Sequence, residues 1–306
     1  MTITRSQFLS LMEPKLKGIV SDKDFDQYPV IYTQFYDMVG SSSKKKETYF
    51  DYAGLGDFTV KNEGGPVTFT DPISGAEISF EHVRFSNGYK VTQEMLDHEQ
   101  YSEVRTLEGE LRRALADFLE VRGHLLLNNA FGTTASAGFS ATDFRAQALI
   151  STTHTQLDGG TAQSNRPSSD ANLDWTSLGN AKIQFGLWKD NRSRNIREMA
   201  RTLIVHPNDE LTAQEVLRSS QKPGTPNNDI NALNGAMTLV VTPYLTDTNS
   251  WFVKGARTKT VWHWDQSPRY GMMEDWDNEI IKRKVVVGFS HGHLDWRGFY
   301  GSSGAS

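Results

Sequence analysis

The sequence predicts a layered fold of mixed helix and strand, either α/β or α+β, on three observations. A long helical pattern covers residues 92–127, hairpin signals precede it, and short strand and helix patterns alternate after it. Each such element has an apolar face or stripe that must be buried, and packed layers of helix and sheet achieve this. The chain has 306 residues, a length that allows two domains.

Residues 1–47 are polar with scattered aromatic side chains, and they end in the Ser/Lys run of residues 41–46. Such a run is typical of a linker or a bend. The aromatic residues follow no steady period. They are therefore compatible with an arm that lies on another surface, or with a short helix and loop on the chain's own domain.

Hairpin signals follow. Two segments alternate apolar and polar residues, Val67–Thr70 and Ala76–Glu81, and the segment Asp71–Gly75 separates them. Pro72 fixes φ and Gly75 tolerates positive φ, so the separating segment is expected to be the turn. Chain breakers on both sides predict a hairpin that projects from the body. An isolated two-stranded hairpin is marginally stable in water, so a projecting one needs a partner surface.

The clearest helix signal lies in residues 92–127, where apolar residues fall mostly three or four positions apart. Thr92 stands in the N-cap position. At 1.5 Å per residue the helix is about 50 Å long, which is enough to span a domain. Gly109 and Gly123 are the positions where we expect it to bend or stop.

The second half of the chain begins with a stretch rich in Ser, Thr, Gly, Asn and Ala, residues 132–180, in which Asp158–Asn172 is expected to be a surface loop. The elements expected after it are a helix at 193–201, a strand at 202–205, a helix at 212–219, and strands at 237–241 and 285–289.

Composition excludes several classes of protein. The absence of cysteine excludes disulfides, thiolate metal sites, iron–sulfur clusters and a Cys nucleophile. The net charge of -5 argues against a strongly basic nucleic-acid binder. No apolar run approaches the ~18 residues of a membrane span, and the first residues show no signal-peptide pattern. We therefore expect a soluble protein that stays in a cytoplasm.

A G-x-S-x-G motif occurs at Gly288–Gly292, directly after an expected strand. In esterases this context places a nucleophilic serine, here Ser290, on a sharp turn. The chain after the motif offers only His293 and Asp295, in the wrong order and too close to fold back. A strand end flanked by glycines is therefore the favoured interpretation, and a serine hydrolase using Ser290 is the competing one.

Two histidines, His291 and His293, have the spacing of neighbours on one face of a strand and are candidate metal ligands. A third ligand such as His263 or Asp265 would have to come from elsewhere, and no pattern predicts that it does. We therefore predict no metal and no cofactor.

Three arginines, Arg194, Arg197 and Arg201, share one face of the expected helix at 193–201. Such a row is compatible with a nucleic-acid contact. Salt bridges to acidic patches, within or between subunits, are favoured, because the first 130 residues carry an acidic excess.

The order of these features resembles a known family. An aromatic arm and a hairpin precede Gly88–Met95, which opens the long helix, and a mixed second domain follows. The segments that carry the resemblance are Leu203–Asn208, Gly224–Leu233 and Leu239–Phe252. The chain resembles, through Phe299, the major capsid proteins of tailed bacteriophages with the Hong Kong ninety-seven type fold. It is similar to the Mu-type major head subunits in particular.

The resemblance implies an α+β fold with an N-terminal arm, an extended loop that overlaps a neighbouring subunit, a peripheral domain with a spine helix, and an axial domain. The implied boundaries are 1–47 for the arm, 48–90 for the extended loop, 91–130 and 256–300 for the peripheral domain, 131–255 for the axial domain, and 301–306 for a C-terminal tail.

The resemblance also implies a function without catalytic residues: pentamers and hexamers that form an icosahedral head and enclose double-stranded DNA without sequence-specific contact. A separate scaffolding protein, or none, and a portal are implied, with assembly in the bacterial cytoplasm and no membrane. The expected contacts between subunits are Asp71, Pro72, Ile73, Gly75, Phe80, Arg194, Arg197 and Arg201. A cytoplasmic adaptor with a binding hairpin is a further alternative.

Overall fold

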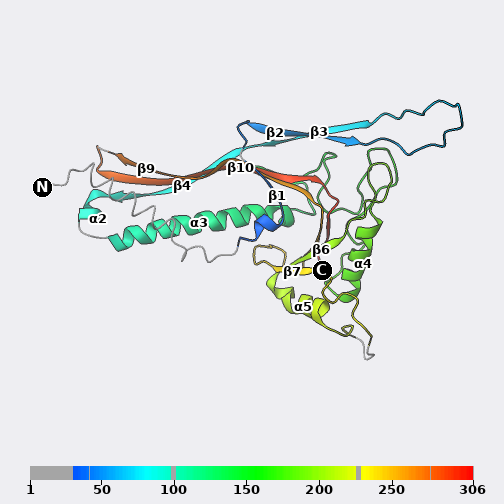
Figure 1. Ribbon diagram of the computed structural model, residues 1–306. Coiled ribbons are helices and arrows are strands. Elements are labelled where there is room, and N and C mark those ends of the chain that lie inside the picture. Colours follow the sequence, from blue (N-terminus) through cyan, green and yellow to red (C-terminus); the bar gives the residue numbers. More distant parts are fainter. Residues whose placement is uncertain (1–29, 41, 98–100, 225–228, 276, 306) are drawn as a thin grey trace.

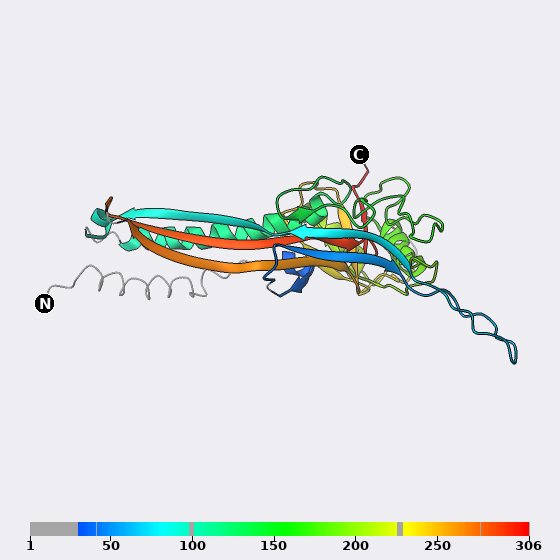
Figure 2. The same ribbon diagram turned by 90° about the horizontal axis from the view of Figure 1, so that it is seen from above.

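A computed structural model describes residues 30–40, 42–97, 101–224, 229–275 and 277–305. Long strands and a long helix form one end of an elongated body, and a smaller sheet with two short helices forms the other (Figure 1). A two-stranded hairpin projects beyond the body at the end of the smaller sheet (Figure 2). Most of the expected N-terminal arm lies outside the described residues.

The larger sheet has the strand order β1-β9-β10-β4, and the short β5 pairs with β10. Its bounds are Asp37–Val39 for β1, Val83–Thr92 for β4, Phe139–Ser140 for β5, Lys259–Asp275 for β9 and Ile280–Asp295 for β10. The antiparallel strands β9 and β10 are its longest members. The expected strand at 285–289 is confirmed as the middle of β10, and β4 is an edge strand.

Helix α3 (Tyr101–Asn128) packs against this sheet, after the short α2 (Gln93–Asp97). The rings of Phe118 and Phe85 lie 5.0 Å apart, which joins the apolar stripe of α3 to β4. The predicted long helix is thus confirmed over most of its length. Thr92, the last residue of β4, directly precedes the helix that begins at Gln93, so it stands at the predicted N-cap position, but of the short α2 rather than of α3.

The helix runs without a break through both Gly109 and Gly123, so the expected interruption is wrong. Gly123 has a packing role instead. A Cβ at this position would lie 2.2 Å from the Cβ of Tyr32, in the 3-10 helix η2 (Tyr32–Gln34). Only glycine lets the chain cross α3 so closely.

The smaller sheet has the order β11-β8-β6-β7 and is covered by α4 and α5. Its elements are α4 (Trp175–Leu187), β6 (Ala200–Val205), η3 (Pro207–Asp209), α5 (Glu210–Arg218), β7 (Thr238–Val241), β8 (Trp251–Gly255) and β11 (Phe299–Ser302). The strands expected at 202–205 and 237–241 and the helix at 212–219 are confirmed. The proposed C-terminal tail begins inside β11, since Gly301 and Ser302 pair with β8.

The hairpin consists of β2 (Lys46–Ala53) and β3 (Ile73–Glu81), joined by the loop 54–72. The predicted strand at Val67–Thr70 is wrong, because these residues lie in the loop. The predicted turn is also wrong, because Ile73 and the residues after it belong to β3. Alternation shows that a segment suits a strand but not which segment it pairs with, and β2 offers a longer ladder.

Candidate functional site

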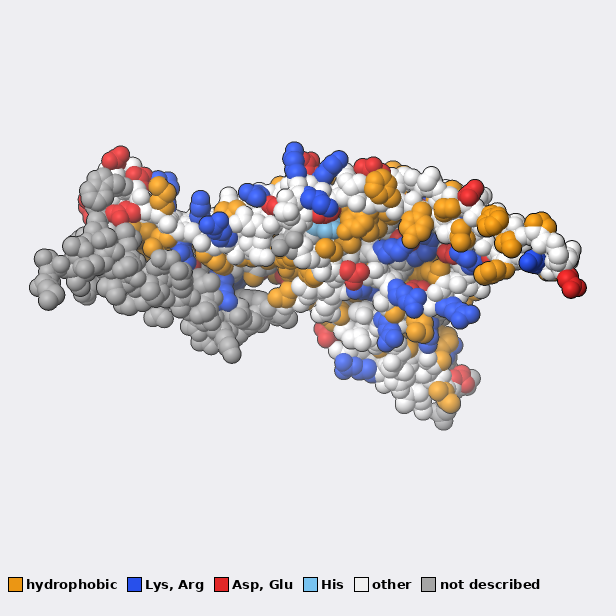
Figure 3. All heavy atoms as spheres, turned by 45° about the horizontal axis from the view of Figure 1, so that its top comes forward, with side chains coloured by type: hydrophobic (Ala, Val, Ile, Leu, Met, Phe, Trp, Pro, Cys, Tyr) orange, Lys and Arg blue, Asp and Glu red, His pale blue; other side chains and the backbone are white. Residues whose placement is uncertain are grey.

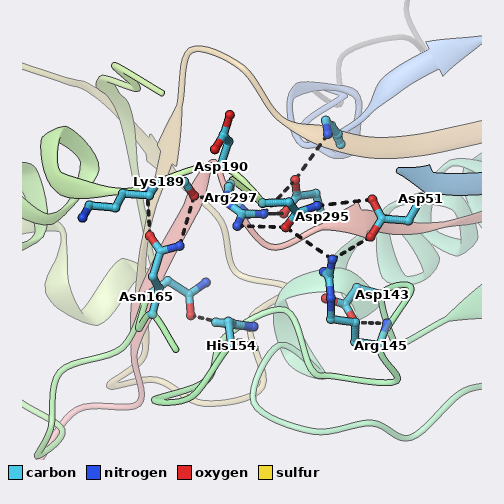
Figure 4. A network of polar contacts seen from close by, with 12 residues as sticks. Asp51, Asp143, Arg145, His154, Asn165, Lys189, Asp190, Asp295 and Arg297 are labelled. Atoms are coloured by element: carbon cyan, nitrogen blue, oxygen red, sulfur yellow. Dashed lines mark hydrogen bonds and ion pairs between the residues drawn. The ribbon is translucent and has the colours of Figure 1, made fainter. Parts of the chain in front are cut away.

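The root of the hairpin is the candidate site, because it joins residues from distant parts of the chain (Figure 4). Asp51 of β2 accepts from Arg145 Nη2 at 2.6 Å. Arg145 and Arg297 both donate to the Asn191 side-chain oxygen at 3.3 Å, and Arg297 also pairs with Asp295 at 3.1 Å. These contacts tie the hairpin to the loop that carries Asn191 and, through Arg297, to the end of β10.

Charge is nearly balanced at this root, where a cavity of about 280 Å³ is lined by basic and acidic side chains together. Burial alone would raise the pKa of Asp295, but the positive charges of Arg297 and Lys259 hold that pKa below its usual value. A balanced set of fixed ion pairs is suited to holding parts of a protein in register rather than to binding one ion.

Arg192 holds the two ends of the hairpin loop together. Its Nε donates to the Gly54 carbonyl at 2.9 Å, and its Nη2 donates to the Asp71 carbonyl at 2.8 Å. Gly54 follows β2 and Asp71 lies two residues before β3, so one guanidinium spans the neck of the loop. The direction in which the loop leaves the body therefore depends on the segment that carries Arg192.

A second set of contacts seats the hairpin on the larger sheet. The Tyr49 hydroxyl and His263 Nε2 lie 2.7 Å apart, and the Phe80 ring packs 5.5 Å from the His263 ring. Burial, followed by the nearby His82, lowers the pKa of His263 to about 4. His263 is therefore neutral at pH 7 and forms its hydrogen bond to Tyr49 in that state.

Ser290 is buried in the middle of β10 and does not lie on a strand-to-helix turn. Its Oγ lies 2.9 Å from His82 Nδ1, a histidine of the hairpin side that the sequence analysis did not consider. The second ring nitrogen of His82 has no partner among the described residues. The described surroundings of Ser290 thus lack the carboxylate that orients the base of a catalytic triad.

The candidate metal ligands are core residues. His291 is fully buried, and its Nδ1 lies 2.9 Å from the Tyr36 hydroxyl. Burial lowers the pKa of His293 to about 4, and it also lowers the pKa of His291 well below its usual value. Among the described residues, no cluster of three or more His, Asp or Glu side chains has the geometry of a metal site.

The expected helix at 193–201 is wrong, so its three arginines share no helical face. The Asp190 carboxylate accepts from the backbone N–H groups of residues 192 and 194, which closes a local turn. Ser193 and Arg197 both have positive φ, which a helix does not allow. Arg194 pairs with Asp190 at 3.0 Å, while Arg197 and Arg201 are exposed, Arg201 on β6.

The expected contact residues of the hairpin are divided between its loop and β3. Asp71 and Pro72 end the loop, and Ile73 and Gly75 belong to β3. Phe80 is only 2% exposed and packs within its own chain.

Sequence reasoning missed the residues that the loop does present. They are the exposed apolar side chains of Leu55, Phe58, Val60, Val67 and Phe69. The loop and the outer side of the hairpin form an apolar strip in Figure 3. The available signal in the sequence was two short apolar–Thr–apolar segments, Phe58-Thr59-Val60 and Val67-Thr68-Phe69.

The comparisons with known proteins bear on this arrangement. The family model described as phage capsid protein matches residues 76–302, which is most of the chain. The chain belongs to the phage capsid protein family. No curated protein matches the sequence. None of the described helices of this capsid protein is long and apolar enough to cross a bilayer.

Solved capsid structures have the same fold at low sequence identity. The procapsid of bacteriophage JBD30 aligns with a TM-score of 0.52 and 12% identity, over 99% of this chain and 77% of that one. The capsid of the cyanophage P-SCSP1u gives 0.56 and 10%, over 91% and 89%. Microbacterium phage Oxtober96 gives 0.53 and 9%, over the whole of both chains.

The predicted α+β fold of the Hong Kong ninety-seven type is thereby confirmed. The prediction of a capsid protein is confirmed as well, and with it a role in the shell of a phage particle. Since a shell is built of many copies of its capsid protein, surfaces that meet a second copy are the functional sites to identify.

Proposed function

We propose that this chain is the major head subunit of a tailed phage and that its hairpin joins neighbouring copies in the shell. The observation that carries the proposal is the loop 54–72, which projects beyond the body and exposes two phenylalanine side chains, Phe58 and Phe69. An aromatic side chain buries ~150–250 Å² when it is covered. At ~25 cal/mol per Å², covering both would stabilise an assembly by roughly 10 kcal/mol before the cost of association.

The proposal also assigns segments of the chain to the parts of a capsid subunit. Residues 1–45, rather than 1–47, would form the arm, because Lys46 begins β2. Helix α3 would be the spine of the peripheral domain together with β9 and β10, and residues 131–255 would form the axial domain. The pairing of β11 with β8 supports moving Phe299–Ser302 to the axial domain. Residues 46–81, rather than 48–90, would be the extended loop, because β4 pairs with β10 along its length.

The further partners follow from the same role. We propose pentamers and hexamers that enclose double-stranded DNA without sequence-specific contact, a portal, a separate scaffolding protein, and assembly in the host cytoplasm. The net charge of -5 supports this, because a shell that clamped its DNA tightly would need a basic chain.

Replacing residues 55–70 by a short Gly/Ser linker is expected to abolish shells while leaving the subunit folded. The loop residues removed belong to no strand, and Gly54 and Asp71, which contact Arg192, remain. Electron microscopy of the overexpressed protein measures shells, tubes or capsomers, and thermal unfolding of the variant measures its fold. A deletion of 67–83 would be unsuitable, since it removes β3 and the buried Phe80.

Exchanging exposed Leu211 on α5 for Ser gives a control that changes a different apolar surface residue. It should form shells like the wild type. Shells of normal shape from the shortened chain would contradict the role given to the hairpin. Only monomers from the wild type, with and without co-expressed scaffold, would contradict the function itself.

A role without catalysis predicts that Ser290→Ala changes no ester hydrolysis measured with the purified protein. The substitution removes the hydrogen bond to His82 and is expected to lower stability by about 1 kcal/mol. Measuring p-nitrophenyl ester hydrolysis by both proteins tests this. A rate that falls in the variant, while its fold is retained, would favour the hydrolase instead.

A further inference from the structure

The hairpin is held to the body of its own chain at two places along its length. The inner one is the seat on the larger sheet, where Tyr49 meets His263. The outer one is the neck clamp, the two hydrogen bonds that Arg192 donates to the carbonyls of Gly54 and Asp71. Tyr49 and Gly54 are five residues apart, which is about 17 Å at the rise of a β-strand. Two fixed points at this separation define the direction in which the hairpin leaves the body.

The seat and the neck clamp belong to different parts of the body. His263 is a residue of β9 in the larger sheet. Arg192 lies in the loop 188–199, which connects α4 to β6 of the smaller sheet. Figure 1 shows the hairpin passing from the larger sheet towards the side of the body that carries α4. Its direction therefore depends on contacts with both parts and not on the larger sheet alone.

The loop 188–199 holds Arg192 in one place. The Asp190 carboxylate accepts from the backbone N–H groups of residues 192 and 194 at 2.8 and 2.9 Å, and the Asp190 N–H donates to the Arg194 carbonyl at 2.7 Å. Trp188, at the start of the loop, is buried in the core of the smaller sheet. The guanidinium therefore projects from a turn that is closed by its own hydrogen bonds and anchored in a core.

The neck clamp uses a property that lysine lacks. Nε and Nη2 of Arg192 belong to one planar group and donate to two acceptors at once, whereas a lysine is a single charged point on a flexible stem. Both acceptors are backbone carbonyls, so the contact does not depend on the side chains of the hairpin. The ion pair between Asp51 and Arg145 lies in the same region but holds β2 alone.

We propose that Arg192 is a positioning residue for assembly, which fixes the angle between hairpin and body and thereby the curvature of the shell. This inference rests on the proposed function, in which the hairpin joins neighbouring copies. Contacts between unlike surfaces of identical subunits close only when the rotation from one copy to the next is right, and they otherwise give open assemblies. A hairpin whose angle is fixed within the subunit supplies one constant rotation, whereas a hairpin that swings does not.

Arg192→Lys tests the neck clamp, because it keeps the positive charge and loses the planar pair of donors. Electron microscopy of the overexpressed full-length variant measures the diameter and shape of its particles. We expect the single diameter of wild-type shells to be lost to mixed sizes, tubes or open sheets. The matched control is Arg197→Lys, the same exchange in the same loop at an exposed residue that makes no hydrogen bond to the described part of the hairpin. Its shells should match the wild type.

A distance measurement on dissociated subunits separates the direction of the hairpin from assembly. Because the natural chain contains no cysteine, spin labels on Ser74→Cys in β3 and Leu211→Cys in α5 report the hairpin relative to the smaller sheet. Pulsed electron paramagnetic resonance should give a narrow distance distribution with Arg192 in place and with Arg197→Lys, and a broad one with Arg192→Lys. A merely structural role would lower the thermal stability of the subunit without broadening the distribution.

The outcomes separate the neck clamp from the shell function. A broad distribution together with irregular shells, or with no shells from a folded subunit, supports the proposal when the control behaves like the wild type. An unchanged distribution, shells of wild-type diameter from Arg192→Lys, or the same defects in Arg197→Lys overturn it and leave the shell function intact. If Arg192→Lys does not fold, Arg192→Ala, which leaves no charge at the neck, is measured in the same way. Failure of the wild-type chain to assemble, with and without co-expressed scaffold, overturns the proposed function and this inference with it.

Discussion

Acidification from pH 6.5 towards pH 4 is expected to unfold the subunit. Burial is the main cause that lowers the pKa values of four histidines to about 4, namely His124, His154, His263 and His293. Burial also lowers the pKa of His291 well below its usual value. In the unfolded chain a histidine binds its proton near pH 6.5. The stabilisation from keeping these rings neutral is therefore complete above pH 6.5 and is lost as the pH falls towards 4. Each proton taken up on unfolding costs about 1.4 kcal/mol per pH unit.

Other groups do not reverse this direction. Burial raises the pKa values of Glu120 and Asp143, so these carboxyls bind a proton at higher pH in the folded state than in the unfolded one. Their protonation on acidification therefore favours the folded state and opposes the loss of stability from the histidines. Together with Asp209, whose pKa burial also raises, they are three carboxyls against five histidines. The carboxyl groups whose pKa values are lowered, such as Asp170 and Asp295, lose their contribution only at still lower pH, below the ordinary value of 3.8.

Tryptophan fluorescence and circular dichroism of dissociated subunits across this pH range measure the transition. His293→Phe is the informative variant, because it keeps an aromatic ring at a fully buried position and removes one titrating group. Its transition should move to lower pH and take up about one proton fewer. A wild-type midpoint below pH 4, or an unchanged proton uptake in the variant, would contradict the account.

The elements that could be predicted from the sequence are those whose pattern is local. The α3 helix follows from its apolar spacing, and β6 follows from Leu203–Val205, which is buried on both faces. The arrangement of these elements in space was implied by the resemblance to phage capsid proteins, because the spacing of apolar residues indicates single helices and strands but not how they pack together. The whole fold class was therefore predictable.

The candidate site was much less predictable, because its geometry depends on pairing between distant segments. The alternation at Val67–Thr70 is real, yet β3 pairs with β2, which is separated from it by the whole loop. The helix expected at 193–201 fails because one side chain, Asp190, captures two backbone N–H groups. Arg192 at the neck of the loop carries no sequence signal at all.

Arg283→Met is expected to destabilise the subunit by about 3–5 kcal/mol, the usual cost of leaving a buried charge without its partner. Arg283 of β10 and Glu108 of α3 are almost completely buried, and their two contacts are each 3.2 Å. The Tyr89 hydroxyl donates to the same carboxylate at 2.7 Å, but a neutral donor does not replace the cation. Urea unfolding of dissociated subunits, followed by circular dichroism, measures the loss.

The double variant Glu108→Leu/Arg283→Met is the decisive comparison. Because the pair pays a large desolvation cost in the wild type, replacing both charges by apolar side chains of similar size is expected to recover most of the stability lost in Arg283→Met. The Tyr89 hydroxyl then loses its acceptor, so the double variant is expected to remain about 1 kcal/mol less stable than the wild type. A double variant no more stable than the single one would mean that α3 is held on the sheet by the ion pair itself. A recovery would mean that apolar packing along α3 holds it, with the ion pair fixing the register of helix and strand.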